Sequence, residues 1–130
     1  LAAQQTNESA DWYKGTADAV RQNISYIERE NPDEVLILSG DQLYRMDFRH
    51  LIETHRGHRA DVTIAAIPVP EKDTPGFGLL SMDTHSRVTG FVEKPKTAEE
   101  RAPYHTSAEW IEKRGIPCNN RHYLANMGIY

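Results

Sequence analysis

The spacing of apolar residues predicts two helices in the first half of the chain. Between Thr16 and Asn31, apolar residues recur every three or four positions, as on the buried face of a helix. Thr16 is expected to cap the start of this helix, and Asn31 to end it because Pro32 follows. A second helix is expected from Asp47 to Gly57. The buried face of the first helix would consist of Ala17, Val20, Ile24 and Ile27.

Short apolar runs predict the strands. The run from Val35 to Leu38 is uninterrupted, which is typical of a strand covered on both faces in a parallel sheet. Residues 97–120 are polar and weakly helical, with Trp110 and Ile111 as apolar anchors. The predicted strands cover residues 35–39, 62–67, 77–82, 87–92 and 123–130, with a hairpin turn at 83–86.

The order of these elements predicts the fold class. Helices and strands alternate in the first part of the chain, and strands predominate in the part that follows. We therefore expect an α/β fold with a mixed, mostly parallel sheet flanked by helices.

Composition narrows the class of protein. The 130 residues allow at most one domain, and the net charge of −4 offers no basic surface for nucleic acid or an anionic membrane. Basic residues do not cluster beyond small groups such as Lys94 to Lys96, and no apolar run approaches the length of a membrane span. A single cysteine, Cys118, excludes an internal disulfide and fits a reducing compartment. Because the chain starts at Leu1 without a methionine and stops at Tyr130 inside a predicted strand, we expect it to be an internal piece of a longer protein.

A carboxylate follows the first predicted strand. Gly40 lets the backbone leave the strand, and Asp41 comes next, at the end of the strand where open α/β sheets bind ligands. An aspartate there could hold a hard cation such as Mg²⁺ together with a phosphate. Asp41 could equally cap the following turn. The local sequence leaves both interpretations open.

Three further groups of residues could take part in binding or catalysis. Gly15 and Thr16 lie at a predicted helix start, after Trp12 and Tyr13, where free backbone N–H groups can bind a phosphate or a base. Helix capping and core packing explain the same residues. Gly78 begins a predicted strand, which signals either a close backbone approach to a ligand or a bulge.

Glu93 and Lys94 form the third group. Pro95 predicts an extended backbone at Lys94, which would direct its ammonium group. Lys94 could neutralise a phosphate while Glu93 accepts hydrogen bonds from sugar hydroxyls. A solvated surface pair is the alternative.

Taken in order, these segments resemble the sugar-nucleotide pyrophosphorylases, and within them the ADP-glucose pyrophosphorylases. The resemblance implies a Rossmann-like nucleotidyltransferase core, of which residues 1–130 would be a part. It also implies a reaction in which ATP and glucose 1-phosphate give ADP-glucose and pyrophosphate, for glycogen or starch synthesis. The segments that carry it are 12–20, 38–47, 77–78, 91–95 and 127–130, which span nearly the whole chain.

The resemblance assigns a role to each candidate residue. On the nucleotide side, Asp41 would be catalytic and would bind Mg²⁺ beside the ATP phosphates. On the sugar side, Lys94 would be catalytic and would hold the phosphate of glucose 1-phosphate. The other nucleotide-binding residues would be Trp12, Tyr13, Gly15 and Thr16, and the other sugar-binding residues Gly78, Glu93 and Asn126. Asn126 stands where a serine is usual before Met-Gly-Ile-Tyr.

The family pattern also extends beyond this chain. A glycine-rich phosphate loop would precede Leu1, and a second metal-binding acid and a β-helix domain would follow Tyr130. We therefore expect catalysis from the longer protein, an allosteric homo- or hetero-tetramer in the cytoplasm or in a plant plastid. Two alternatives are a non-catalytic regulatory subunit of the same family and a pyrophosphorylase for another nucleotide or sugar 1-phosphate.

Overall fold

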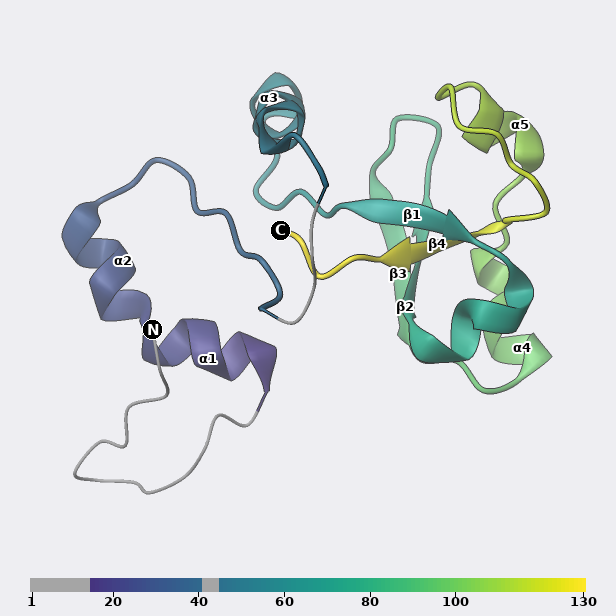
Figure 1. Ribbon diagram of the computed structural model, residues 1–130, viewed down its shortest axis with the longest axis horizontal. Helices are drawn as coiled ribbons and strands as arrows, with labels where there is room; N and C mark the ends of the chain where they lie inside the picture. The colour runs from purple at the N-terminus through teal and green to yellow at the C-terminus, as the bar shows by residue number, and fades with distance from the viewer. Residues whose placement is uncertain (1–14, 41–44) are drawn as a thin grey trace. The chain divides into compact units, whose positions relative to one another are not determined.

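The computed structural model describes residues 15–40 and 45–130, in two compact units (Figure 1). The first unit ends at Leu36, and the second runs from Ile37 to Tyr130. Among the described residues, no helix has both the length and the apolar character that a membrane crossing requires.

The first unit contains two short helices in place of the single predicted one. These are α1 (Thr16–Gln22) and α2 (Ile24–Glu30). The break falls at Asn23, whose side-chain Nδ2 donates to the carbonyl oxygen of Ala19 at 2.8 Å. Such a bond from an asparagine side chain competes with regular helix geometry. The predicted end is confirmed, because Asn31 adopts a left-handed conformation with φ 44°.

Two details predicted for this helix are wrong. Gly15 is the N-cap of α1, and Thr16 is its first helical residue. The backbone of Gly15 has φ 151°, a conformation that side-chain-bearing residues rarely adopt, so glycine takes the cap position. Neither helix contains a buried residue, and Ile24 is 51% exposed, so the predicted buried face is absent from both helices.

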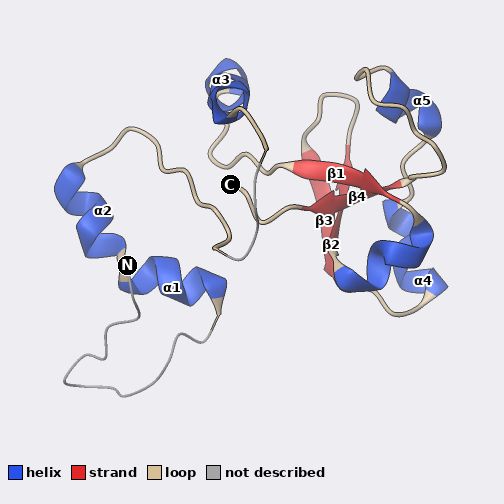
Figure 2. Cartoon of the chain, in the orientation of Figure 1, coloured by secondary structure: helices blue, strands red, loops and turns tan. Residues whose placement is uncertain are grey.

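The second unit is built on a four-stranded sheet with the order β1-β4-β2-β3 (Figure 2). Every strand pair in the described residues is antiparallel, so the predicted mostly parallel sheet is wrong, although helices and strands are mixed as expected. Parallel neighbours need a long crossover, whereas β2 and β3 are joined by a short turn. The strands are β1 (Ala66–Val69), β2 (Gly78–Met82), β3 (Val88–Glu93) and β4 (Tyr123–Asn126).

The apolar run after residue 34 is not the buried strand that its sequence predicts. Within the second unit, Leu38 forms an isolated antiparallel bridge with Ile129, and Ile37 exchanges backbone hydrogen bonds with Tyr130. Val35 is 44% exposed and Leu38 is 41% exposed. A strand is covered on both faces only when layers pack on each side, and the described residues supply no such cover here.

Two strands differ from their predicted bounds by more than one residue. The strand expected at 62–67 is displaced to β1 and passes through Pro68, which is tolerated because β1 is an edge strand of the described sheet. The strand expected at 123–130 ends at Asn126. Beyond it, Ala65 still exchanges backbone hydrogen bonds with Met127 and Ile129.

The β2–β3 hairpin is confirmed. Its turn is closed by Asp83, whose backbone N–H donates to the Arg87 carbonyl at 2.9 Å. The Asp83 carboxylate accepts hydrogen bonds from the backbone N–H groups of Arg87 and His85. These bonds, led by the one from Arg87, hold the pKa of Asp83 below its usual range. The indole of Trp110, in α5 (Ala108–Glu112), donates to the carbonyl of Asp83 at 3.0 Å, which confirms it as an anchor.

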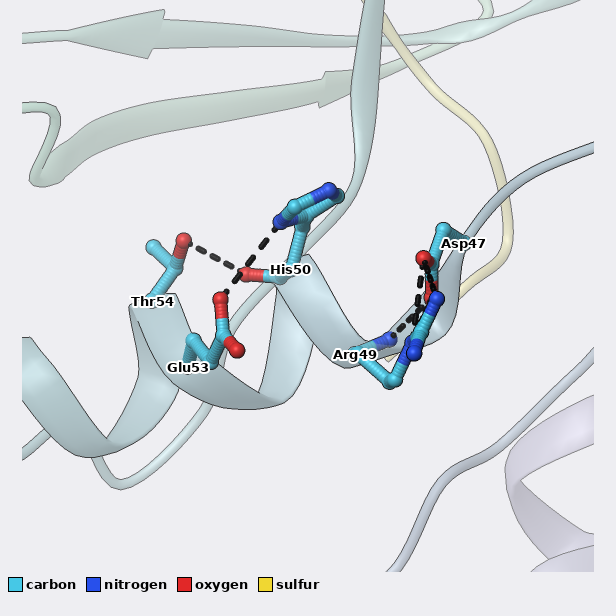
Figure 3. A network of polar contacts seen from close by, with 5 residues as sticks. All are labelled: Asp47, Arg49, His50, Glu53 and Thr54. Atoms are coloured by element: carbon cyan, nitrogen blue, oxygen red, sulfur yellow. Dashed lines mark hydrogen bonds and ion pairs between the residues drawn. The ribbon is translucent and has the colours of Figure 1, made fainter.

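Helix α3 (Phe48–His58) begins where the sequence predicts, after Asp47 (Figure 3). The Asp47 carboxylate accepts from the backbone N–H of Arg49 at 3.0 Å and pairs with the Arg49 guanidinium at 2.6 Å. Hydrogen bonds from Arg49 hold the pKa of Asp47 below its usual range. The bond from the Arg49 side chain has the larger effect and the bond from its backbone N–H the smaller. Further along the helix, Nδ1 of His50 lies 3.4 Å from Oε2 of Glu53. The cap is thus a local feature that the sequence already contains.

One cluster of the apolar core lies on the face of the sheet that carries Leu79, while Leu80 and Leu124 are buried on the opposite face. Leu79 is fully buried at the centre of this cluster, and Val92 and Tyr104 pack against its edge. Residues directly opposite each other in the ladder share a face, so Leu79, Val92 and Ala125 point to the same side. The buried residues of this cluster are Val69, Leu79, Tyr123 and Ala125.

We expect Leu79→Ala to destabilise the protein by about 2–5 kcal/mol, because a fully buried leucine leaves a cavity when it is truncated. Equilibrium urea unfolding of the full-length protein measures this change. The control is Val88→Ala in the neighbouring strand, since Val88 is 44% exposed and its truncation should cost below about 0.5 kcal/mol. Equal losses in the two variants would contradict the placement of the core.

Candidate functional site

The sheet brings four of the predicted site residues to one end. Gly78, the first residue of β2, lies directly opposite Glu93, the last residue of β3. Lys94 follows Glu93 in the chain. In the ladder between β2 and β4, Leu79 lies opposite Ala125, so one further step of the antiparallel register puts Asn126 beside Gly78.

A side chain at residue 78 would displace two of its neighbours. A Cβ atom at this position would lie 2.7 Å from Cε2 of Phe91 and 2.8 Å from Oε2 of Glu93. These two side chains converge over the backbone of Gly78, and the predicted approach of a ligand to this residue stays a prediction. The sequence alone marked Gly78 without showing what approaches it.

Lys94 does not have the extended backbone that Pro95 predicts. Its φ is 46°, in the left-handed region. Holding a non-glycine residue there costs about 1–3 kcal/mol, so the surroundings must impose it. Two contacts do so: the backbone N–H of Lys94 donates to the carbonyl of Phe77 at 3.1 Å, and the ring of Pro95 is fully buried.

The chain after Pro95 is anchored as well. Thr97 and Glu100 form a capping box at the start of α4 (Ala98–Arg101). The Glu100 carboxylate accepts from the N–H groups of Lys96 at 2.6 Å and Thr97 at 3.2 Å. These hydrogen bonds hold the pKa of Glu100 below its usual range, and the bond from the N–H of Lys96 has the larger effect. Lys94 is therefore presented from a chain segment held on both sides.

The two charges at this end of the sheet are available to a ligand. Lys94 Nζ lies 3.7 Å from Glu93 Oε1, and both side chains are about 60% exposed. An ion pair of this length in solvent contributes little to stability, at most about 1 kcal/mol. A phosphate near Lys94 and a hydroxyl near Glu93 could therefore displace the pair at low cost.

Asn126 is oriented by two hydrogen bonds. Its Nδ2 donates to the hydroxyl of Tyr130 at 2.7 Å, and its Oδ1 accepts from the N–H of Gly128 at 2.9 Å. An amide carries two N–H donors and two oxygen lone pairs, so one of each remains beyond these bonds. Its predicted contact with a sugar remains a prediction.

The predicted nucleotide residues are not assembled by the described part of the chain. Gly15 and Thr16 belong to the first unit, where the carbonyl of Gly15 accepts from the N–H of Ala19 at 3.1 Å. Trp12, Tyr13 and Asp41 lie outside the described residues. Their roles stay predictions.

Residues 15–40 and 45–130 contain no group of three His, Cys, Asp or Glu side chains placed to hold a metal ion. A groove of about 860 Å³ lies elsewhere in the second unit, between the end of α3, the hairpin turn and α5. Trp110 and Leu124 line it, and none of the predicted site residues does. The chemistry suggested by Glu93 and Lys94 is therefore separate from this hollow.

Sequence reasoning missed Phe91 as a member of this site. Phe91 is in the segment that carries the family resemblance, but no role was drawn from it. The available signal was the strand period of two, which puts residues 91 and 93 on the same face. What the sequence could not show is that Gly78 lies beneath both side chains.

Comparison with known proteins finds similarity along the whole chain. A family model described as "Nucleotidyl transferase" matches residues 1–130. The chain is also 42% identical, over all of its 130 residues, to the protein named "Glucose-1-phosphate adenylyltransferase small subunit, chloroplastic/amyloplastic" of Triticum aestivum. The matched region is 27% of that relative, so the chain spans about a quarter of its length.

Proposed function

The chain belongs to the nucleotidyl transferase family, and on that premise we propose that the full-length protein is a glucose-1-phosphate adenylyltransferase. It would make ADP-glucose and pyrophosphate from ATP and glucose 1-phosphate, for starch or glycogen synthesis. The observation that carries this proposal is the 42% identity, along the entire chain, to a protein named for that activity. The proximity of Gly78, Glu93, Lys94 and Asn126 at one end of the sheet is consistent with this proposal.

The sugar phosphate would bind at this end of the sheet. Lys94 would place its ammonium group against the phosphate, and Glu93 would accept hydrogen bonds from the sugar hydroxyls. The backbone of Gly78 and the amide of Asn126 would contribute further polar contacts. The support for this arrangement is the register that aligns these residues and the exposure of both charges.

The nucleotide would bind through the other predicted residues. Gly15 would meet the adenine through its backbone beside Thr16, and Trp12 and Tyr13 would shape the pocket around the base. Nucleotidyl transferases generally use a divalent metal ion, and Asp41 would hold Mg²⁺ here. Mg²⁺ characteristically binds through one or two carboxylates together with substrate phosphates, which suits an aspartate in this role. When bound, Mg²⁺ supplies positive charge beside the phosphate oxygens.

The reaction would proceed by positioning and charge stabilisation. A phosphate oxygen of glucose 1-phosphate attacks the α-phosphorus of ATP, and the bond from that phosphorus to the leaving pyrophosphate breaks. Lys94 holds the attacking phosphate and offsets its negative charge. This lowers the repulsion between glucose 1-phosphate and ATP, which are both anions. Glu93 fixes the sugar so that the attacking oxygen has one orientation. The step requires no covalent intermediate with the protein.

Our proposals for subunit assembly and cellular location are based on the same relative. That protein is named as a small subunit and as chloroplastic/amyloplastic. We propose that the full-length protein is an allosteric homo- or hetero-tetramer, in a plastid if the source is a plant and otherwise in the cytoplasm. The alternatives of a non-catalytic regulatory subunit or another substrate pair are less well supported by this match.

A pyrophosphate-release assay tests the proposal. We expect the full-length protein to turn over glucose 1-phosphate with ATP much faster than with UTP, GTP or dTTP. A second series, with ATP and other sugar 1-phosphates, tests the choice of sugar. Preference for a nucleotide other than ATP, or an absence of turnover with every pair, would contradict the assignment.

A further inference from the structure

We infer that Phe91 contributes to binding of the sugar phosphate by packing its aromatic ring against the apolar face of the sugar, beside Glu93. This inference rests on the proposed function, since it adds a contact to the same sugar site. Phe91 belongs to β3 and lies directly opposite Leu80 in β2. Because side chains alternate along a strand, Phe91 shares its face with Glu93.

The exposure of Phe91 differs from that of its neighbours on this face. Leu80 is fully buried and Leu124 is 3% exposed, whereas Phe91 is 50% exposed. A single exposed aromatic residue needs no special explanation. The position of this one does, because its ring is directed toward the end of the sheet where the polar site residues gather.

The second observation is the convergence over Gly78. The edge of the Phe91 ring and the Glu93 carboxylate both come within 2.8 Å of the point where a Gly78 Cβ would lie. The backbone conformation of Gly78 does not itself require glycine, since its φ is not in the left-handed region. Glycine leaves open space here, and that space is filled by an aromatic ring next to a carboxylate.

This combination matches the chemistry of a sugar phosphate. A pyranose ring has C–H groups on its faces and hydroxyl groups around its rim, and a phosphate adds two negative charges. The face of Phe91 suits the C–H groups, the carboxylate of Glu93 suits the hydroxyls, and Lys94 suits the phosphate. Three adjacent groups on one strand end therefore complement three parts of one ligand.

Steady-state kinetics of the full-length Phe91→Leu variant tests this inference. We expect KM for glucose 1-phosphate to rise about tenfold, the effect of losing one aromatic contact, while KM for ATP changes less than about twofold. Phe91→Tyr keeps the ring and should retain a KM near that of the wild type. The control is Val88→Ala, at the other end of the same strand and similarly exposed, which should change neither KM.

The outcomes separate the two proposals. If the wild-type protein does not use glucose 1-phosphate, the proposed function fails before any variant is compared. If the wild type is active and Phe91→Leu leaves KM for glucose 1-phosphate within twofold, the role of Phe91 is overturned. Equal changes in both KM values, with a lower Tm, indicate a purely structural residue and also overturn it.

Gly78→Ala provides a second variant if Phe91→Leu does not fold. The added Cβ forces the Phe91 ring and the Glu93 carboxylate to move, so the same KM should rise while KM for ATP is maintained. An unchanged KM for glucose 1-phosphate in Gly78→Ala overturns the inference without recourse to Phe91→Leu.

Discussion

Replacing Asp41 by Asn in the full-length protein is expected to lower kcat by about 100-fold or more, because the amide cannot supply the charge that holds a hard cation against the ATP phosphates. Asn matches Asp in size, so the fold should survive and Tm should change little. Pyrophosphate release at saturating ATP and glucose 1-phosphate measures the loss. The variant should also require a higher Mg²⁺ concentration for half-maximal rate.

The matched control is Asp47→Asn, six residues along the chain. The Asp47 carboxylate caps α3 and pairs with Arg49, and Asn is an equally good N-cap residue. This variant should therefore keep its kcat. A near-normal kcat in Asp41→Asn, or an equal loss in both variants, would contradict a metal-binding role for Asp41.

Lys94→Ala is expected to raise KM for glucose 1-phosphate by about 10- to 100-fold, the worth of a charge-assisted hydrogen bond to phosphate. KM for ATP should change much less. Alanine keeps the Cβ atom, so the left-handed backbone at this position is no more and no less strained than with lysine. The loss then reports on the ammonium group and not on the conformation of the chain.

Lys96→Ala is the control for this experiment. Lys96 lies two residues further on, and it is its backbone N–H that contacts Glu100 in the capping box. Its substitution should leave both KM values unchanged. If Lys94→Ala has the same KM for glucose 1-phosphate as the wild type, Lys94 is not the phosphate anchor.

Features that depend on neighbouring residues were predictable from the sequence. Asp47 caps α3 through the N–H of a residue two positions away, and Asp83 closes the hairpin turn through groups within four residues. The sequence also identified Glu93 and Lys94 as candidate site residues, through the resemblance of the chain to a family. The cap and the turn each need only one short segment of sequence, whereas the resemblance needs five segments in order along the chain.

Features that depend on distant partners were not predictable in the same way. The run from Val35 to Leu38 has the composition of a buried strand, but burial needs layers from elsewhere, and Val35 and Leu38 are exposed. Pro95 favours an extended Lys94 by local sterics. Burial of the Pro95 ring and a hydrogen bond to Phe77 override that preference, because together they can outweigh a strain of about 1–3 kcal/mol.

The sequence by itself determined the family, the candidate chemical groups and the helices and turns that local contacts stabilise. Only the tertiary structure decided that the sheet is antiparallel and that Gly78 pairs with Glu93, with Asn126 one residue beyond the last pair of β2 and β4. It alone showed that Phe91 and Glu93 share the space above Gly78. The physical reason is that strand register is a pairing between residues far apart in the chain, and no single segment contains both partners.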